Sequence, residues 1–164
     1  MLAYWNSLRK GRDVPDQSDI DPNKLKPVLP CIFLLEAQSN GNFVYRLAGT
    51  SICRRYGSEL RGQDFLQRWH AEHRPRVAEL LSQSLGTATP LCVLSAGITE
   101  RHSHVIETES ILLPTTSDRV TCDRFLCASH ILMGEIGWRK RRILSERLVA
   151  ALLISDSPSG DATA

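Results

Sequence analysis

The stretch that decides the fold is residues 31–48, CIFLLEAQSNGNFVYRLA, in which two apolar runs flank a turn. The first run is compact and apolar up to a glutamate, which predicts a strand, and residues 39–42 have the composition of a tight turn. In the second run apolar and polar residues alternate, so Phe43 and Tyr45 share one face while Arg46 lies on the other. The stretch therefore predicts a β-hairpin with one buried face.

Outward from this hairpin, the chain predicts helices and then three more strands. Apolar residues recur at helical spacing after Pro75, at Val77, Leu80, Leu81 and Leu85. Shorter helices are predicted around 50–57 and 65–69, and strands over 91–94, 105–113 and 120–133. This order lacks the strictly alternating βαβ units of a doubly wound sheet. We therefore expect an α+β domain in which a five-stranded antiparallel sheet carries helices on one face.

The same patterns divide the chain into four parts. We expect an N-terminal helical extension over 1–30, the sheet domain over 31–133, a basic amphipathic helix over 134–154 and a disordered tail over 155–164.

Composition places the chain among ordinary globular proteins. It has 164 residues, 42% hydrophobic and 23% charged, which suits one domain with a real core. No apolar run approaches the length of about 20 residues that a membrane-spanning helix needs. The first residues lack the pattern of an export signal, and the five cysteines form no C-x-x-C pair. We therefore expect a cytoplasmic protein without disulfides.

The positive charge is concentrated near the C-terminus. The net charge is +2, but in residues 139–147 five basic residues stand against Glu146, so this segment alone carries +4 and the rest of the chain −2. In the predicted helix this basic start precedes an apolar seam that includes Leu144 and Leu148. The helix could pack on its own domain or on a second copy, or it could dock residues 138–154 on an anionic membrane surface. Nucleic acid is not the expected partner, because few basic residues and no interleaved aromatics are present.

Four local motifs, together with the order of elements, resemble a family. They are residues 18–22 (SDIDP), 45–50 (YRLAGT), 56–62 (YGSELRG) and the pair Asp123-Arg124. Over roughly residues 4–131 the chain resembles a short, stand-alone bacterial PAS domain. The resemblance implies a five-stranded antiparallel sheet cupped around short helices, and a sensor or interaction module of signalling that often forms dimers. It does not identify a cofactor.

Two departures limit what the resemblance implies. Asp64 stands where the flavin photosensors of the family need a reactive cysteine, so we expect no flavin adduct. Haem-binding members use an axial histidine on the long helix, and residues 76–85 contain none, so we do not expect haem.

The predicted elements bring a set of candidate site residues together. We expect a cavity between sheet and helices that is lined by Phe43, Tyr45, Tyr56, Phe65, Trp69 and Leu81, with Arg46 and Arg124 as its polar residues. The alternative for the two arginines is a solvated face or ion pairs, with Glu107, Glu109 or Asp123 as partners. We expect Trp5, Trp138, Leu144 and Leu148 to contact a partner. No catalytic motif occurs, and His102 and His104 alone do not make a metal site.

These expectations favour a non-enzymatic sensory or regulatory module. It would act through protein–protein association, with itself or with a signalling protein, and a small ligand in the cavity would gate it. The alternative is a ligand-free adaptor whose basic C-terminal helix docks on anionic membrane or nucleic acid.

Overall fold

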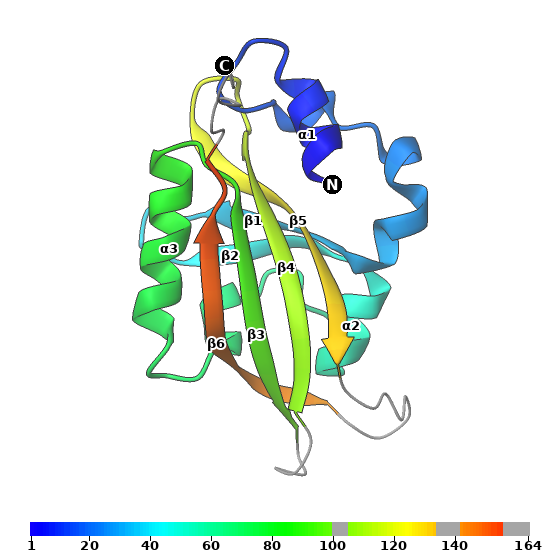
Figure 1. Ribbon diagram of the computed structural model, residues 1–164, viewed down its shortest axis with the longest axis vertical. Helices are drawn as coiled ribbons and strands as arrows, with labels where there is room; N and C mark the ends of the chain where they lie inside the picture. The colour runs from blue at the N-terminus through cyan, green and yellow to red at the C-terminus, as the bar shows by residue number, and fades with distance from the viewer. Residues whose placement is uncertain (100–104, 134–141, 156–164) are drawn as a thin grey trace, which may run out of the picture.

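The computed structural model describes residues 1–99, 105–133 and 142–155 (Figure 1). The helices are α1 (Leu2–Arg9), α2 (Thr50–Tyr56) and α3 (Arg74–Gly86), with 3₁₀ segments η1 (Gln17–Asp19), η2 (Pro22–Cys31) and η3 (Phe65–Arg68). The strands are β1 (Ile32–Ala37), β2 (Phe43–Ala48), β3 (Leu91–Thr99), β4 (Val105–Thr116), β5 (Cys122–Met133) and β6 (Ile143–Leu153).

All these strands join one antiparallel sheet in the order β2-β1-β5-β4-β3-β6. The predicted α+β architecture is confirmed, with six strands in place of five. The predicted hairpin is β1–β2, and Gly41 in its turn has φ +84°, a conformation that glycine adopts without the strain a side chain would bring. The helix predicted after Pro75 is α3, and the helix predicted before Gly57 is α2.

The prediction of a helix over 134–154 is wrong for the part that the structure describes. Residues 143–153 form β6, which pairs along β3 from Leu91 opposite Leu153 to Thr99 opposite Ile143. Without β6, this edge of β3 would leave its backbone N–H and C=O groups unpaired, and the ladder outweighs the weak helical preference of a short apolar run. Trp138 and the tail after Ser155 lie outside the described residues.

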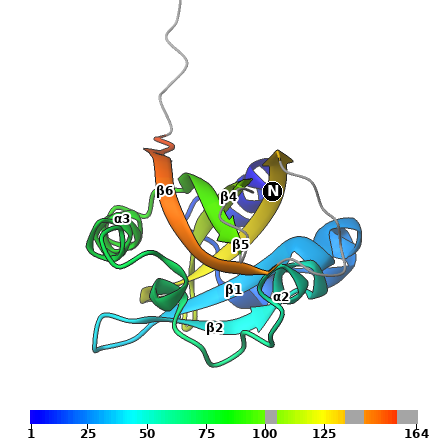
Figure 2. The same cartoon turned by 90° about the horizontal axis from the view of Figure 1, so that it is seen from below.

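The helices α2 and α3, with η3, cover the inner face of the sheet and enclose the main core (Figure 2). Its largest fully buried members include Tyr45, Phe125, Leu81 and Leu112. The core therefore lies where the two-residue period of the strands predicts it, between the inner face and the helices.

The N-terminal extension packs on the opposite, outer face and forms a second core. Trp5 is only 1% exposed, and its Nε1 donates a hydrogen bond of 2.7 Å to the carbonyl oxygen of Pro114 on β4. Val14 and Leu25 join it against Leu113 and other outer-face residues. Because Trp5 is buried within its own chain, the prediction that its side chain contacts a partner is wrong.

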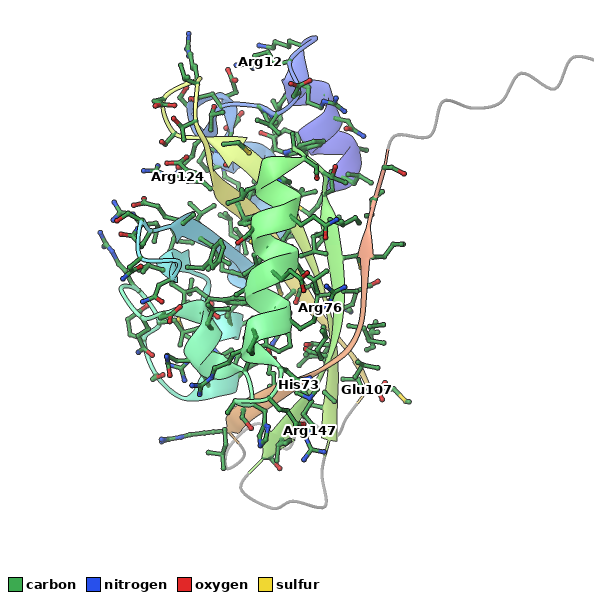
Figure 3. All side chains as sticks on the ribbon, turned by 90° about the vertical axis from the view of Figure 1, so that its left-hand side faces the viewer. Arg12, His73, Arg76, Glu107, Arg124 and Arg147 are labelled. Atoms are coloured by element: carbon green, nitrogen blue, oxygen red, sulfur yellow. The ribbon has the colours of Figure 1, made fainter. Side chains whose placement is uncertain are left out.

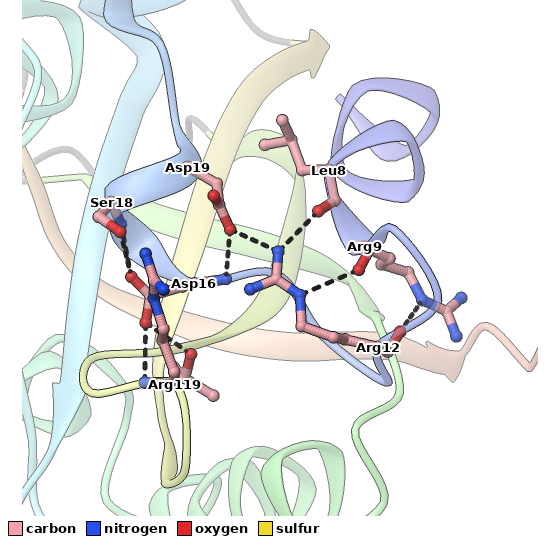
Figure 4. Close-up of polar contacts among 8 residues, drawn as sticks. Leu8, Arg9, Arg12, Asp16, Ser18, Asp19 and Arg119 are labelled. Atoms are coloured by element: carbon pink, nitrogen blue, oxygen red, sulfur yellow. Dashed lines mark hydrogen bonds and ion pairs between the residues drawn. The ribbon is translucent and has the colours of Figure 1, made fainter.

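A buried carboxylate ties this extension to the loop between β4 and β5 (Figure 4). Asp16 accepts hydrogen bonds from the backbone and hydroxyl of Ser18, from Thr116 Oγ1 (2.8 Å) and from the backbone N–H of Arg119 (2.9 Å). Chiefly the hydroxyl of Ser18, with the other donors, holds the pKa of Asp16 well below its usual range. Beside it, Arg12 and Asp19 form an ion pair of 2.5 Å.

Candidate functional site

A small cavity lies between the inner face of the sheet and the segments α2 and η3. Its volume is about 20 Å³, which is room for about one water molecule. It is lined by Phe33, Tyr45, Ile52, Arg55, Tyr56, Phe65, Trp69, Val93, Ser110, Leu112, Ser129 and Glu146.

Aromatic rings fill one side of this cavity. Phe65 is at the centre, with ring centroids 6.0 Å from Phe33, 5.7 Å from Tyr45 and 5.8 Å from Trp69. Edge-to-face and stacked contacts of this kind add to the stability that area burial supplies. The aromatic side is therefore closely packed and leaves little free volume.

Glu146, on β6, forms the polar side. It is 5% exposed, and its Oε1 accepts a hydrogen bond of 2.8 Å from the hydroxyl of Tyr56. The hydroxyl of Ser95 on β3 also bonds to this carboxyl, and that hydroxyl lies 2.7 Å from Thr108 Oγ1. Glu146 stands opposite Gly97 in the β3–β6 ladder. The edge strand thus carries a carboxyl group into the interior of the domain.

Burial raises the pKa of Glu146, because the ionised carboxylate loses its hydration. The hydroxyl of Tyr56 and the charge of Arg55 act in the opposite direction. Burial, and then the nearby Glu146, also raise the pKa of the Tyr56 phenol well above its ordinary value. Burial therefore favours the protonated form of both groups.

Two arginines flank this pair. Arg55 donates to the hydroxyl and the carbonyl oxygen of Ser129 on β5, both at 2.8 Å. The guanidinium of Arg68 lies over the ring of Tyr56, 5.3 Å from its centroid. Helix α2 is thereby anchored to both β5 and β6.

Trp69 connects the cavity to the backbone of β6. Its Nε1 is buried and has no hydrogen-bond partner among the described residues. Trp69 forms a parallel bridge with Glu146, and the next N–H, of His70, donates 2.8 Å to the carbonyl oxygen of Glu146. One residue of β6 is thus held through its side chain by Tyr56 and through its backbone by His70.

The structure brings half of the predicted cavity residues together. Tyr45, Tyr56, Phe65 and Trp69 line the cavity, whereas Phe43 and Leu81 are buried in the same core without lining it. Sequence reasoning missed Glu146, Arg55 and Ser129. Glu146 lies in a basic segment predicted as a helix. Regular alternation from the buried Ile143 would place it on the other face, and the irregularity of the β3–β6 ladder between Ile143 and Ser145 turns it inward.

Arg46 and Arg124 are not cavity residues, so that prediction is wrong. They meet at Glu36 on the outer face, where Oε2 lies 3.3 Å from Arg46 Nε and 2.9 Å from Arg124 Nη2. Arg124 lies at the end of the molecule remote from Arg147, the neighbour of Glu146 (Figure 3). The ion-pair alternative was the better one, with Glu36 as a partner that the sequence analysis did not name.

Asp64, at which the resemblance to flavin photosensors would require a cysteine, has a structural role. Its carboxylate caps η3 through the N–H of Leu66 (3.0 Å) and also accepts from the N–H of Phe43 (3.3 Å) on β2.

Within residues 1–99, 105–133 and 142–155, no three histidine, cysteine or acidic side chains gather as a metal site. His102 and His104 lie outside these residues.

A larger, open groove of about 590 Å³ lies between the N-terminal extension and the outer face of the sheet. It is lined by Met1, Leu2, Pro27, Val28, Cys31, Cys92, Glu109, Ile111, Ala128, Ser129, His130 and Ile154.

Of the predicted partner contacts on β6, Leu144 is 53% exposed, whereas Leu148 packs against the main core.

Comparison with known proteins identifies the fold family. The family described as PAS domain matches residues 1–129, and among curated proteins no match was found. No helix in the described part of the chain is long and apolar enough to cross a membrane. Strand β6 and its Glu146 lie beyond the matched residues. The chain belongs to the PAS domain family, whose members are in general sensory or regulatory modules rather than catalysts.

Proposed function

We propose that this protein is a regulatory module that acts through association, and that Glu146 communicates the state of its internal cavity to strand β6. The observation that carries the proposal is the position of Glu146, a cavity-lining residue on the edge strand that bonds to Tyr56.

The size of the cavity limits how a ligand could act. A volume of about 20 Å³ holds about one water, so any larger guest must displace part of the lining. Tyr56 and Trp69 are both tied to Glu146, one by its hydroxyl and the other by a backbone bridge. Movement of either residue would weaken the attachment of β6, and a ligand that binds the moved state better shifts the population toward it.

Filling the cavity by substitution tests this coupling without knowledge of the ligand. Ser110 lines the cavity from β4, so the larger side chain of Ser110→Leu fills the cavity and displaces its lining as a bound ligand would. Ser110→Ala, which adds no volume, is the matched control. We expect faster amide hydrogen exchange over residues 143–153 in the leucine variant only. Equal exchange of β6 in both variants, with the leucine variant folded, would refute the coupling.

The near-complete filling of the cavity supports a second candidate, a ligand-free interaction module. Native mass spectrometry of protein purified from its host separates the two, because it reports retained small molecules and subunit number together. A retained small molecule supports gating. A complex with no such molecule supports the ligand-free module, and association that falls steeply with salt would assign it to an anionic partner.

A further inference from the structure

The two edge strands of the sheet, β2 and β6, differ in how far the chain's own backbone covers them. At β2, the outer edge of the sheet, Tyr45 N–H donates to Gln63 O at 3.0 Å and Gly62 N–H donates to Tyr45 O at 2.8 Å. Asp64 extends this closure by a bridge to Val44. The β2 edge is therefore covered by its own chain at Val44 and Tyr45.

The opposite edge, on β6, is closed only at its start. The bond from His70 N–H to the carbonyl oxygen of Glu146 and the bridge to Trp69 cover the first part of the strand. Beyond Glu146, residues 147–153 form backbone hydrogen bonds with β3 alone, within the part of the chain that the structure describes. This leaves a stretch of edge without a partner.

The hydrogen bond at the end of β6 shows which groups point outward. Ile154 N–H donates 2.8 Å to Pro90 O, toward β3. Because the direction alternates along an antiparallel strand, the backbone of Leu152 faces β3, while the N–H and C=O groups of Ala151 and Leu153 point to the free side. The bulge in this ladder falls before Ala150, so the stretch that follows is regular.

The side chains of this stretch offer none of the usual protection. Residues 148–154, LVAALLI, contain neither charge nor proline, although edge strands commonly carry one or the other to prevent pairing. Val149 is 55% and Leu152 is 66% exposed, and Ala150 and Ala151 between them are exposed as well. An uncharged, regular and open edge is suited to another extended backbone.

We propose that the free edge of β6 at residues 150–153 binds an extended, uncharged segment of a partner protein, which adds to the sheet as a further strand. This inference rests on the proposed association function and names the surface that performs it. Helix α3 lies beside β6, on the inner side of the free edge (Figures 1 and 3). A two-fold axis that paired β6 with β6 of a second copy would bring the two α3 helices together, whereas a single extended segment avoids this.

A synthetic peptide provides the probe, with the sequence LVAALLI between terminal lysines. We expect it to slow the hydrogen exchange of the Ala151 and Leu153 amides, which have no hydrogen-bond acceptor among residues 1–99, 105–133 and 142–155. Ala151→Pro removes an outward donor without breaking the β3 ladder, and we expect it to weaken peptide binding about tenfold. Leu152→Ala is the matched control, because the backbone of residue 152 faces β3 and the variant stays uncharged, and we expect a change within about twofold.

Three results would overturn the assignment. They are unchanged exchange at Ala151 and Leu153 with saturating peptide, equal losses in the Ala151→Pro and Leu152→Ala variants, and self-association of the protein that Ala151→Pro abolishes. Self-association that Ala151→Pro abolishes would mean that the β6 edge binds a second copy of this protein. Because the exchange measurement uses the unmodified protein, misfolding of a variant leaves the test intact. Failure here is distinguishable from failure of the proposed function, which the Ser110 variants address separately.

Discussion

Replacing Tyr56 by phenylalanine removes one hydroxyl from the interior and little else. That hydroxyl donates 2.8 Å to Glu146 Oε1; Glu146 is buried and Tyr56 is half-buried. A hydrogen bond to a charged partner contributes about 1.5–3 kcal/mol, and one between neutral groups about 1 kcal/mol. We therefore expect Tyr56→Phe to cost about 2 kcal/mol when Glu146 is ionised and about 1 kcal/mol when it is protonated.

A double-mutant cycle with Glu146→Gln isolates the part of this interaction that depends on the charge of Glu146, since glutamine resembles the protonated acid. Urea unfolding of the four proteins over a range of pH should give a coupling of about 1 kcal/mol at the higher pH values, where Glu146 is ionised, and near zero at the lower ones, where it is protonated. At the higher pH the loss in Tyr56→Phe corresponds to a fall in melting temperature of about 4–8 °C. A coupling below about 0.3 kcal/mol over the whole range would refute an ionised Glu146 as the partner of the Tyr56 hydroxyl.

Burial raises the folded-state pKa of Glu146 above its unfolded value, so its stabilising contribution is complete below the unfolded pKa and is lost as pH rises through the folded pKa. Glu146→Gln should therefore flatten the fall in unfolding free energy on the alkaline side, and an unchanged slope would contradict the assignment. Asp16 has the opposite sign, because the donors led by Ser18 lower its folded pKa; its contribution is present above the unfolded pKa and is lost as pH falls through the folded pKa. Asp16→Asn should cost about 2 kcal/mol near neutral pH and less in acid, as urea titrations will measure; equal costs at both would argue against the carboxylate. Gly49→Ala should cost more than about 3 kcal/mol in a thermal melt, because its Cβ would overlap two backbone carbonyl oxygens of η2, whereas Gly86→Ala, with open space around it, is the control and should change stability by less than about 1 kcal/mol.

The predicted cavity shows where sequence reasoning succeeds and where it stops. Tyr45 was placed inward by the two-residue period of its strand, and Tyr56 and Phe65 by their helical segments; all three line the cavity. A local period settles which face a residue occupies, because it depends only on neighbouring residues. It does not settle partners. Arg124 pairs with Glu36, a residue far away in the sequence that the β1–β5 ladder brings opposite it.

What the sequence alone determined is the set of elements whose preference is local: the hairpin over 31–48, the helix after Pro75 and the antiparallel α+β class. The tertiary structure decided residues 143–153, whose short apolar run is compatible with either a helix or a strand. The open backbone groups of β3 resolved that ambiguity, because a ladder with β6 satisfies them and an isolated helix does not. In becoming a strand, the segment turned Glu146 inward to Tyr56, a contact across 90 residues of chain that no local pattern contains.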